Sequence, residues 1–280
     1  MVNPAGIRLL LYCFAVIGIN SQSIAADNLM PAAGVIENKQ CLQCHEKTEN
    51  KLVNSWRNSV HAKSEPVVDC VACHGHEHES VMVSVRQDQI CRECHGGAKS
   101  PVVHSYASSK HGVLMQIEGD QQDWMQPLQL ANYRTPGCSY CHMHAGEHDV
   151  STSVRQDLMA DSELEAVQDK VQSVCQDCHS PRYVARLLEN GEAMLEIARK
   201  KIREADRLIE QAAGEFSEQA LMPARQQMIK MRQHLLNVHL GVGHQSPDYQ
   251  WWHGQPALDG DLIRIKGVIS ALRQAGFPAD

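Results

Sequence analysis

The pattern Cys-x-x-Cys-His occurs five times between residues 41 and 179 and constrains this chain more than any other feature. It is the attachment site of a c-type haem, in which both cysteines form thioethers and the histidine is the proximal iron ligand. The attachment cysteines are Cys41 and Cys44, Cys70 and Cys73, Cys91 and Cys94, Cys138 and Cys141, and Cys175 and Cys178. The proximal histidines are His45, His74, His95, His142 and His179. We therefore predict five covalently bound haem c groups.

Paired Cys-x-x-Cys units also occur in zinc ribbons, and the spacing from Cys73 to Cys91 would suit one. Five units cannot all be paired, however, and a zinc ribbon does not require a histidine after every unit. A disulfide framework would explain an even number of cysteines but not five histidines in register. Haem attachment is the interpretation that explains both features.

The first 25 residues have the pattern of a secretory signal peptide. Arg8 precedes an apolar run from Leu9 to Ile19, and small residues precede Ala26. The apolar run is short for a membrane span, and an uncleaved anchor is the alternative. Cys13 lies in this run, so the ten cysteines of the mature chain all belong to the five motifs. No later segment is apolar enough to cross a bilayer, and we predict a periplasmic protein without a membrane span.

The charge of the chain limits its partners. The formal net charge is −7, and loss of Arg8 with the signal peptide would make it −8. Haem propionates would add further negative charge, which argues against nucleic acid as a partner. We expect the partners to be other redox proteins, either donor or acceptor cytochromes or an oxidoreductase.

Several histidines outside the motifs are candidates for distal iron ligands. His61 follows a segment of helical periodicity, residues 48–60, between the first two motifs. His104 and His111 are two helical turns apart, so one helix would present both on the same face, with Gly112 as its stop. His148 lies four residues after His144 and could share its face. A fifth distal ligand remains open among four further histidines, namely His76, His78, His239 and His244.

The last hundred residues contain no cysteine and show strong helical periodicity. Apolar residues alternate steps of three and four from Leu188 to Ala212, and the pattern resumes from Leu221 to Val238. A third helix is expected over residues 258–275. The loop expected before it contains Tyr249 and the adjacent Trp251 and Trp252, which suggests a subunit, partner or haem-edge contact. Packing against the haem-bearing part is the alternative.

These patterns predict a mainly α fold with little sheet. The predicted divisions are a signal peptide over 1–25, a pentahaem cytochrome c domain over 26–182 and a C-terminal bundle of long helices over 183–280.

The chain resembles the hydroxylamine oxidoreductase-related family of multihaem cytochromes c. The resemblance rests on Ser55-Trp56 with His61, on His104 with Ser-Ser-Lys-His111-Gly112, on Cys141-His142-Met143 with Gly146-Glu-His148, and on the C-terminal helices. It implies haems with two histidine ligands stacked in series, with His61, His104, His111 and His148 as distal ligands. It also implies a possible trimer held together by the C-terminal helices.

The chain departs from that family in ways that bear on activity. The family's enzymes have eight haems, one of them catalytic, whereas this chain has five motifs. A tyrosine of hydroxylamine-oxidising members cross-links to the catalytic haem of a neighbouring subunit, and Tyr249 does not align with it securely. The Cys-x-x-Cys-Lys motif of the related nitrite reductases does not occur.

We therefore predict a periplasmic pentahaem cytochrome that transfers single electrons through bis-histidine haems, without assigning it a catalytic residue. One alternative is a hydroxylamine oxidoreductase-like or nitrite-reducing enzyme, or one acting on sulfur compounds, with an open distal site at one haem. The other is a docking subunit of a larger redox complex.

Overall fold

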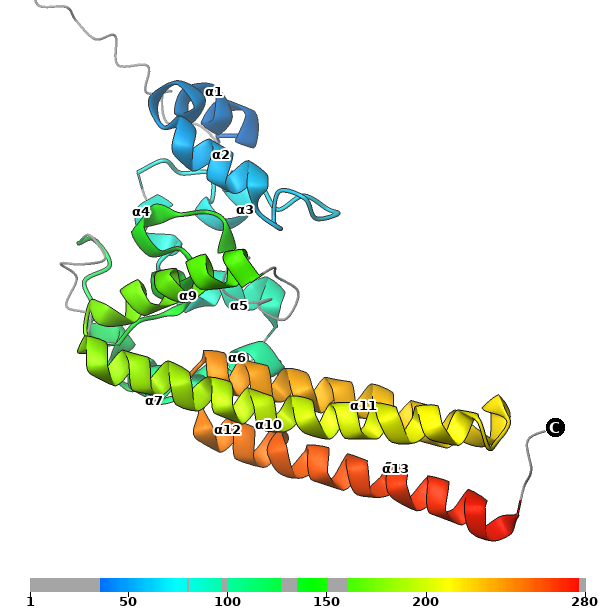
Figure 1. The fold of residues 1–280 in the computed structure, drawn as a ribbon. Coiled ribbons are helices and arrows are strands. Elements are labelled where there is room, and N and C mark those ends of the chain that lie inside the picture. The colour runs from blue at the N-terminus through cyan, green and yellow to red at the C-terminus, as the bar shows by residue number, and fades with distance from the viewer. Residues whose placement is uncertain (1–35, 80, 97–99, 127–134, 151–160, 277–280) are drawn as a thin grey trace, which may run out of the picture. The chain divides into compact units, whose positions relative to one another are not determined.

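The computed structural model describes residues 36–79, 81–96, 100–126, 135–150 and 161–276. The predicted signal peptide lies outside these residues. The described residues form helices and no strand, which confirms the mainly α fold (Figure 1). No described helix is both long enough and apolar enough to cross a membrane.

The haem-attachment region consists of short helices joined by turns. They are α1 (Asn38–Thr48), α2 (Asn50–Asn58), α3 (Cys70–His74), α4 (Val81–Ser84), α5 (Asp88–His95), α6 (Pro101–Ala107), α7 (Lys110–Glu118), η1 (Gly119–Gln121), α8 (Cys138–His142), η2 (His144–Gly146) and α9 (Asp161–Gln176). Among the described residues before α10, only Val53, Val103 and Tyr140 are buried hydrophobic residues. This region therefore has almost no apolar side-chain core of its own.

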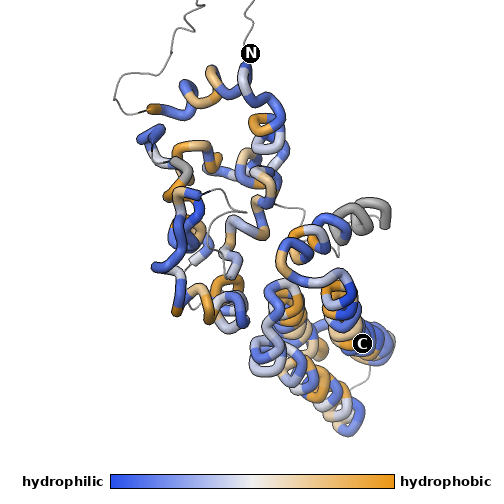
Figure 2. The backbone as a smooth tube through the Cα atoms, turned by 90° about the vertical axis from the view of Figure 1, so that its left-hand side faces the viewer, coloured by the Kyte–Doolittle hydropathy of each residue, from blue (hydrophilic) through white to orange (hydrophobic). Residues whose placement is uncertain are grey.

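The C-terminal part consists of long helices: α10 (Pro181–Ala213), α11 (Glu218–Gly243), α12 (Pro247–His253) and α13 (Gln255–Ala275). Helices α10, α11 and α13 pack against one another in pairs (Figure 1). Apolar residues recur along them (Figure 2). Their buried side chains, which include Leu195, Ile202, Leu221, Met231 and Ile265, form one continuous core. The buried residues of α10 and α11 follow the predicted periodicity, and α10 ends at Ala213, next to the expected break at Gly214.

Two helices replace the single one expected around His104 and His111. Helix α6 ends at Ala107, and Ser109 caps α7 by accepting a hydrogen bond from the Gly112 amide at 3.0 Å. The two histidines therefore do not share one helical face. Gly112 is not a stop but lies in the first turn of α7. A Cβ there would approach the Tyr106 carbonyl oxygen to 2.1 Å, so glycine permits the tight corner between α6 and α7.

Two further local expectations also differ from the structure. The segment expected as a loop before the third long helix contains α12, because the Ser246 hydroxyl accepts a hydrogen bond from the Tyr249 amide and Pro247 occupies the first turn. His144 and His148 do not lie on one α-helix, since η2 is a single 3₁₀ turn in which Ala145 has φ 57°.

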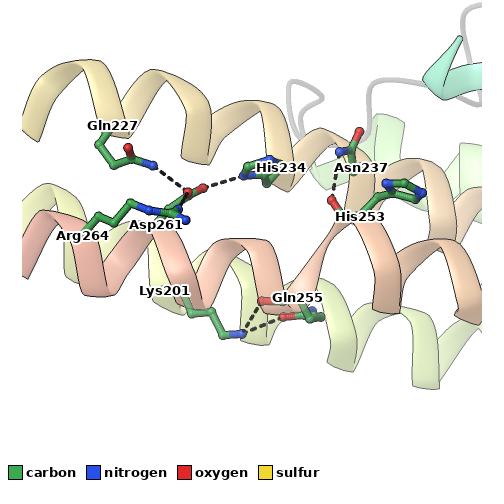
Figure 3. A network of polar contacts seen from close by, with 8 residues as sticks. All are labelled: Lys201, Gln227, His234, Asn237, His253, Gln255, Asp261 and Arg264. Atoms are coloured by element: carbon green, nitrogen blue, oxygen red, sulfur yellow. Dashed lines mark hydrogen bonds and ion pairs between the residues drawn. The ribbon is translucent and has the colours of Figure 1, made fainter. Parts of the chain in front are cut away.

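A polar network crosses the C-terminal helices around Asp261, whose side chain is buried in the apolar core. Its carboxylate accepts hydrogen bonds from Gln227 at 2.6 Å, from His234 at 2.6 Å and from Arg264 at 3.0 Å (Figure 3). Lys201 of α10 donates to Gln255 at the start of α13. These contacts tie α10 and α11 to α13 by directional bonds in addition to apolar packing.

Candidate functional site

Each of the five motifs begins in a helix, which fixes the spacing between its cysteines and its histidine. The first four lie in α1, α3, α5 and α8, and the fifth begins at Cys175 in the last turn of α9. Aspartates support two of these helices. Asp69 caps α3 by accepting from the Ala72 amide at 3.0 Å, and Asp88 accepts from the Cys138 amide at 2.7 Å. The Asp88 contact also links the third motif to the fourth.

All ten motif cysteines are free thiols and are at least partly accessible. No disulfide joins any two of them. They are therefore available for thioether attachment.

The histidines of the five motifs each lie opposite a different histidine from elsewhere in the chain. The pairs, with the distances between ring centroids, are His45 with His78 at 6.4 Å, His74 with His148 at 6.1 Å, His95 with His61 at 6.1 Å, His142 with His244 at 6.4 Å, and His179 with His111 at 6.0 Å. Each of these five contacts joins one motif histidine to one other histidine, and none of the five partner histidines occurs in two of the pairs.

The common distance is the one expected for two imidazoles bound to a single iron. A bond between a metal ion and an imidazole nitrogen is about 2 Å long, so rings on opposite sides of one ion have centroids roughly 6 Å apart. Direct contacts between aromatic rings also span about 4.5–7 Å between centroids, so what distinguishes these pairs is that one distance recurs at all five motifs, each time with a different histidine. The residues present therefore fit haem groups with two axial histidines.

A cavity of about 2220 Å³ runs along these pairs. It is lined by residues from all five motifs and by all five partner histidines, and its lining is mostly apolar. Ligand pockets usually measure about 300–1,000 Å³, so this cavity has room for several large planar groups. It also occupies the region that lacks an apolar side-chain core.

Thiols of successive motifs lie close enough to influence one another. Burial raises the pKa of Cys70 to about 11, with a further contribution from Cys41 in the preceding motif. Burial raises the pKa of Cys73, assisted by Cys91 and Cys94 of the third motif. A hydrogen bond with Cys138 of the fourth motif lowers the pKa of Cys91.

The fourth and fifth motifs are neighbours as well. Burial raises the pKa of Cys141 to about 12, and the thiols of Cys175 and Cys178 add to that effect. Asp177, inside the fifth motif, accepts hydrogen bonds from Tyr140 at 2.8 Å and from His144 at 2.7 Å. Each of these contacts joins two motifs that are adjacent in the sequence.

Burial keeps several of the paired histidines neutral. It lowers the pKa of His61, His111, His142 and His148, and it lowers that of His244 to about 4 with a contribution from His142. A neutral imidazole has the lone pair that a metal ligand needs. The charge state of these rings therefore suits iron ligation.

The remaining candidate histidines lie elsewhere. His104 contacts Tyr249 at 5.4 Å and His253 at 5.2 Å between ring centroids, with T-shaped geometry, and not a motif histidine. His76 Nδ1 is 2.8 Å from the Ile36 carbonyl oxygen. His239 lines the cavity but is not one of the ring partners described above. Trp251 and Trp252 are 64% and 75% exposed.

Four residues of this region were not identified from the sequence: Asp69, Asp88, Arg86 and Ser105. Arg86 is buried and donates hydrogen bonds to the carbonyls of Trp124, at 2.8 Å, and of Gln126. Ser105 is buried against His244. The partners of Asp88, Arg86 and Ser105 lie in distant segments, so no local pattern marks these three residues. Asp69 had a local signal, because it lies immediately before Cys70 in the position of an N-cap.

Comparisons with known proteins agree with this geometry. The family model described as "Seven times multi-haem cytochrome CxxCH" matches residues 58–225, and that of "Cytochrome c554 and c-prime" matches residues 17–75. A probable nitrite reductase-hydroxylamine oxidoreductase fusion protein of Kuenenia stuttgartiensis is 25% identical in an alignment of 225 residues that covers 62% of this chain. The matched part is only 26% of that relative.

Two solved structures share the fold. One is a chain of the Kuenenia stuttgartiensis reducing HAO-like protein complex, with a TM-score of 0.57 and 17% identity, covering 85% of each chain. The other is a hypothetical multihaem protein with a TM-score of 0.56 and 14% identity, covering 74% of this chain and 58% of that one. The chain is similar in sequence to one hydroxylamine oxidoreductase-related protein and shares the fold of a chain from a reducing HAO-like complex. Since the first family model matches more than half of the chain, the protein belongs to the multihaem CxxCH cytochromes c, whose haems are bound covalently.

Proposed function

We propose that the chain is a pentahaem electron-transfer protein in which two histidines hold each iron. The pairs are His45 with His78, His74 with His148, His95 with His61, His142 with His244, and His179 with His111. The observation that carries this proposal is the separation of 6.0–6.4 Å in all five pairs.

The paired histidines decide what kind of chemistry these sites support. When bound, haem supplies an iron centre that gains and loses one electron, at a potential set largely by its axial ligands. If both imidazoles of a pair ligate the iron, no coordination position would be left for a substrate. The residues of this chain therefore favour electron transfer over the binding of nitrogen or sulfur compounds.

The order of the motifs in space supports a relay. Neighbouring thiols connect the first motif to the second, the second to the third, and so on to the fifth. Electrons would then pass from haem to haem in the order of the motifs, between redox partners at the two ends.

We also propose that the protein is exported to the periplasm by residues 1–25, as the N-terminal pattern predicts.

We propose the same two domains that the sequence predicts, residues 26–182 for the haems and residues 183–280 for the long helices. The second domain would also contribute one haem ligand to the first. His244 belongs to the second of them and would ligate the haem of the fourth motif. The C-terminal helices would thus be part of a haem site as well as a scaffold or a possible trimer contact.

Two measurements on the mature protein test the proposal. A pyridine haemochrome assay should give five haems per chain. Electron paramagnetic resonance of the oxidised protein should show only low-spin ferric haem. A high-spin signal in stoichiometric amount, with turnover of hydroxylamine or nitrite, would instead favour an enzyme with an open distal site.

A further inference from the structure

His244 reaches the fourth motif from the C-terminal end of α11, where it is the C-cap residue. Its Nδ1 lies 2.7 Å from the hydroxyl oxygen of Ser105, in α6. Ser105 is fully buried, and α6 packs against α11. The hydroxyl and the imidazole therefore meet at a contact between the haem-bearing region and the long helices.

The Ser105 hydroxyl has a second contact that suits one direction of this hydrogen bond. A serine hydroxyl has one hydrogen to donate, and the Val102 carbonyl oxygen, 2.9 Å from the Ser105 hydroxyl oxygen, can accept it. A hydroxyl that donates to this carbonyl has only acceptor capacity left for His244. In that arrangement Nδ1 of His244 carries the hydrogen. A neutral imidazole has a single N–H, so Nε2 has the free lone pair.

We infer that Ser105 is a positioning residue that sets the tautomer and ring orientation of His244 as the distal ligand of the fourth haem. The inference rests on the proposed ligand pairing. Outer-shell partners of metal-bound histidines act in this way, by holding the non-ligating nitrogen. Ser105 touches the ligand and not the haem iron.

A second distal histidine shows the same proton placement by a different means. The Nδ1 of His148 lies 2.9 Å from the carbonyl oxygen of Gly146, which can only accept. There the backbone fixes the tautomer, whereas at His244 a side chain does so. A substitution can therefore remove the contact at His244 without altering the backbone.

The experiment compares four variants of the full haem-loaded protein. Ser105→Ala removes the acceptor, and Ser105→Thr retains a hydroxyl. Ser108→Ala is the matched control, because Ser108 lies just beyond the same helix and bonds the His104 carbonyl at 2.8 Å and the Ser246 hydroxyl at 3.1 Å, but not a distal histidine. His244→Ala defines the spectrum and ligand binding of the fourth haem without its distal ligand.

The readout is the binding of cyanide to the oxidised protein, with the high-spin fraction measured in parallel. Loss of an outer-shell partner weakens ligation by about 10- to 100-fold, so Ser105→Ala should bind cyanide at one haem more tightly by a factor in that range. Ser105→Thr should return to the wild-type value, and Ser108→Ala should not differ from it. The thermal unfolding midpoint of each variant is measured as well, so that a local change at the fourth haem can be told from destabilisation of the whole protein.

Each outcome decides a different point. If His244→Ala creates no high-spin haem, the proposed ligand pairing is wrong. If it does, but Ser105→Ala binds cyanide like the wild type, then Ser105 does not position His244 and the pairing stands. If Ser105→Ala and Ser108→Ala change cyanide binding equally, or Ser105→Thr fails to restore it, the contact has only a structural role.

Discussion

Histidine is abundant in this chain, with 16 residues, so the residue type alone says little about which rings ligate iron. The neighbours of each ring decide the matter. His104 and His111 are close in sequence, yet His111 lies opposite the motif histidine His179 and His104 packs on Tyr249 and His253. The corner between α6 and α7 turns the two side chains toward different surroundings.

Substituting these two histidines should have different effects. His111→Ala should remove one distal ligand and convert one haem to a five-coordinate, high-spin form. His104→Ala should leave every haem low-spin, because its ring contacts are with Tyr249 and His253 and not with a motif histidine. Electron paramagnetic resonance of the two oxidised variants provides the measurement. A high-spin haem in His104→Ala would show that His104 is a distal ligand and would contradict the proposed pairing.

Glycine at position 112 should be required for the same corner. In Gly112→Ala the new Cβ would lie 2.1 Å from the Tyr106 carbonyl oxygen, which is backbone and cannot move aside. Overpacking of this kind costs about 1–3 kcal/mol. Gly267→Ala is the control, since an added Cβ there would meet no atom within 4 Å outside the neighbouring backbone of α13, and alanine should stabilise that helix by about 1 kcal/mol. Thermal unfolding should show opposite shifts, and equal shifts would contradict this account.

The sequence predicts a helix well where a long helix buries one face with a regular period. It predicts helix boundaries less well where two short helices join. The seam from Leu195 to Ala212 is buried as the three-and-four spacing requires, because a long helix repeats the same environment every two turns. Residues 101–111 have no such repeat, and a serine cap with a close backbone approach divides them. The five attachment motifs could be predicted because each consists of five consecutive residues. The ring opposite each motif depends on distant packing, so His78 and His244 were only two of several candidates.

The Asp261 network makes a prediction for the long helices. Asp261→Ala would remove the carboxylate that accepts hydrogen bonds from Gln227 and His234. Leaving these donors without an acceptor should lower the free energy of unfolding by about 1–3 kcal/mol. Asp206→Ala is the matched control, because Asp206 pairs with Arg232 at 3.1 Å on an exposed surface between α10 and α11. An exposed pair contributes about 0–1 kcal/mol. Chemical denaturation followed by circular dichroism would measure both, and equal losses would show that the buried network adds nothing.

Over the whole molecule, the apolar core and the attachment sites occupy different parts of residues 35–280. The continuous core is confined to residues 195–269, whereas the short helices before α10 surround the cavity. Side chains alone bury too little in that region to offset the conformational entropy of ordering it. The haem groups therefore have to supply its interior.

A chain produced without haem attachment should show this division directly. We expect residues 38–180 to be digested rapidly by protease, while α10 to α13 persist as a helical fragment. Mass spectrometry of the digest and circular dichroism of the remaining fragment would measure the effect, with the haem-loaded protein as control. Protection of residues 38–180 in the haem-free chain would show that this region folds without its cofactors.

The histidine pairs also determine the order in which the haem sites acquire both of their ligands during synthesis. A chain made from its N-terminus presents His78 soon after His45, so the first site has both its ligands early. The fourth site must wait for His244, after most of α11 has been synthesised. On the proposed pairing, nascent intermediates would hold a haem at the fourth motif with one side open to foreign ligands. A truncation before residue 244 would make that exposure permanent.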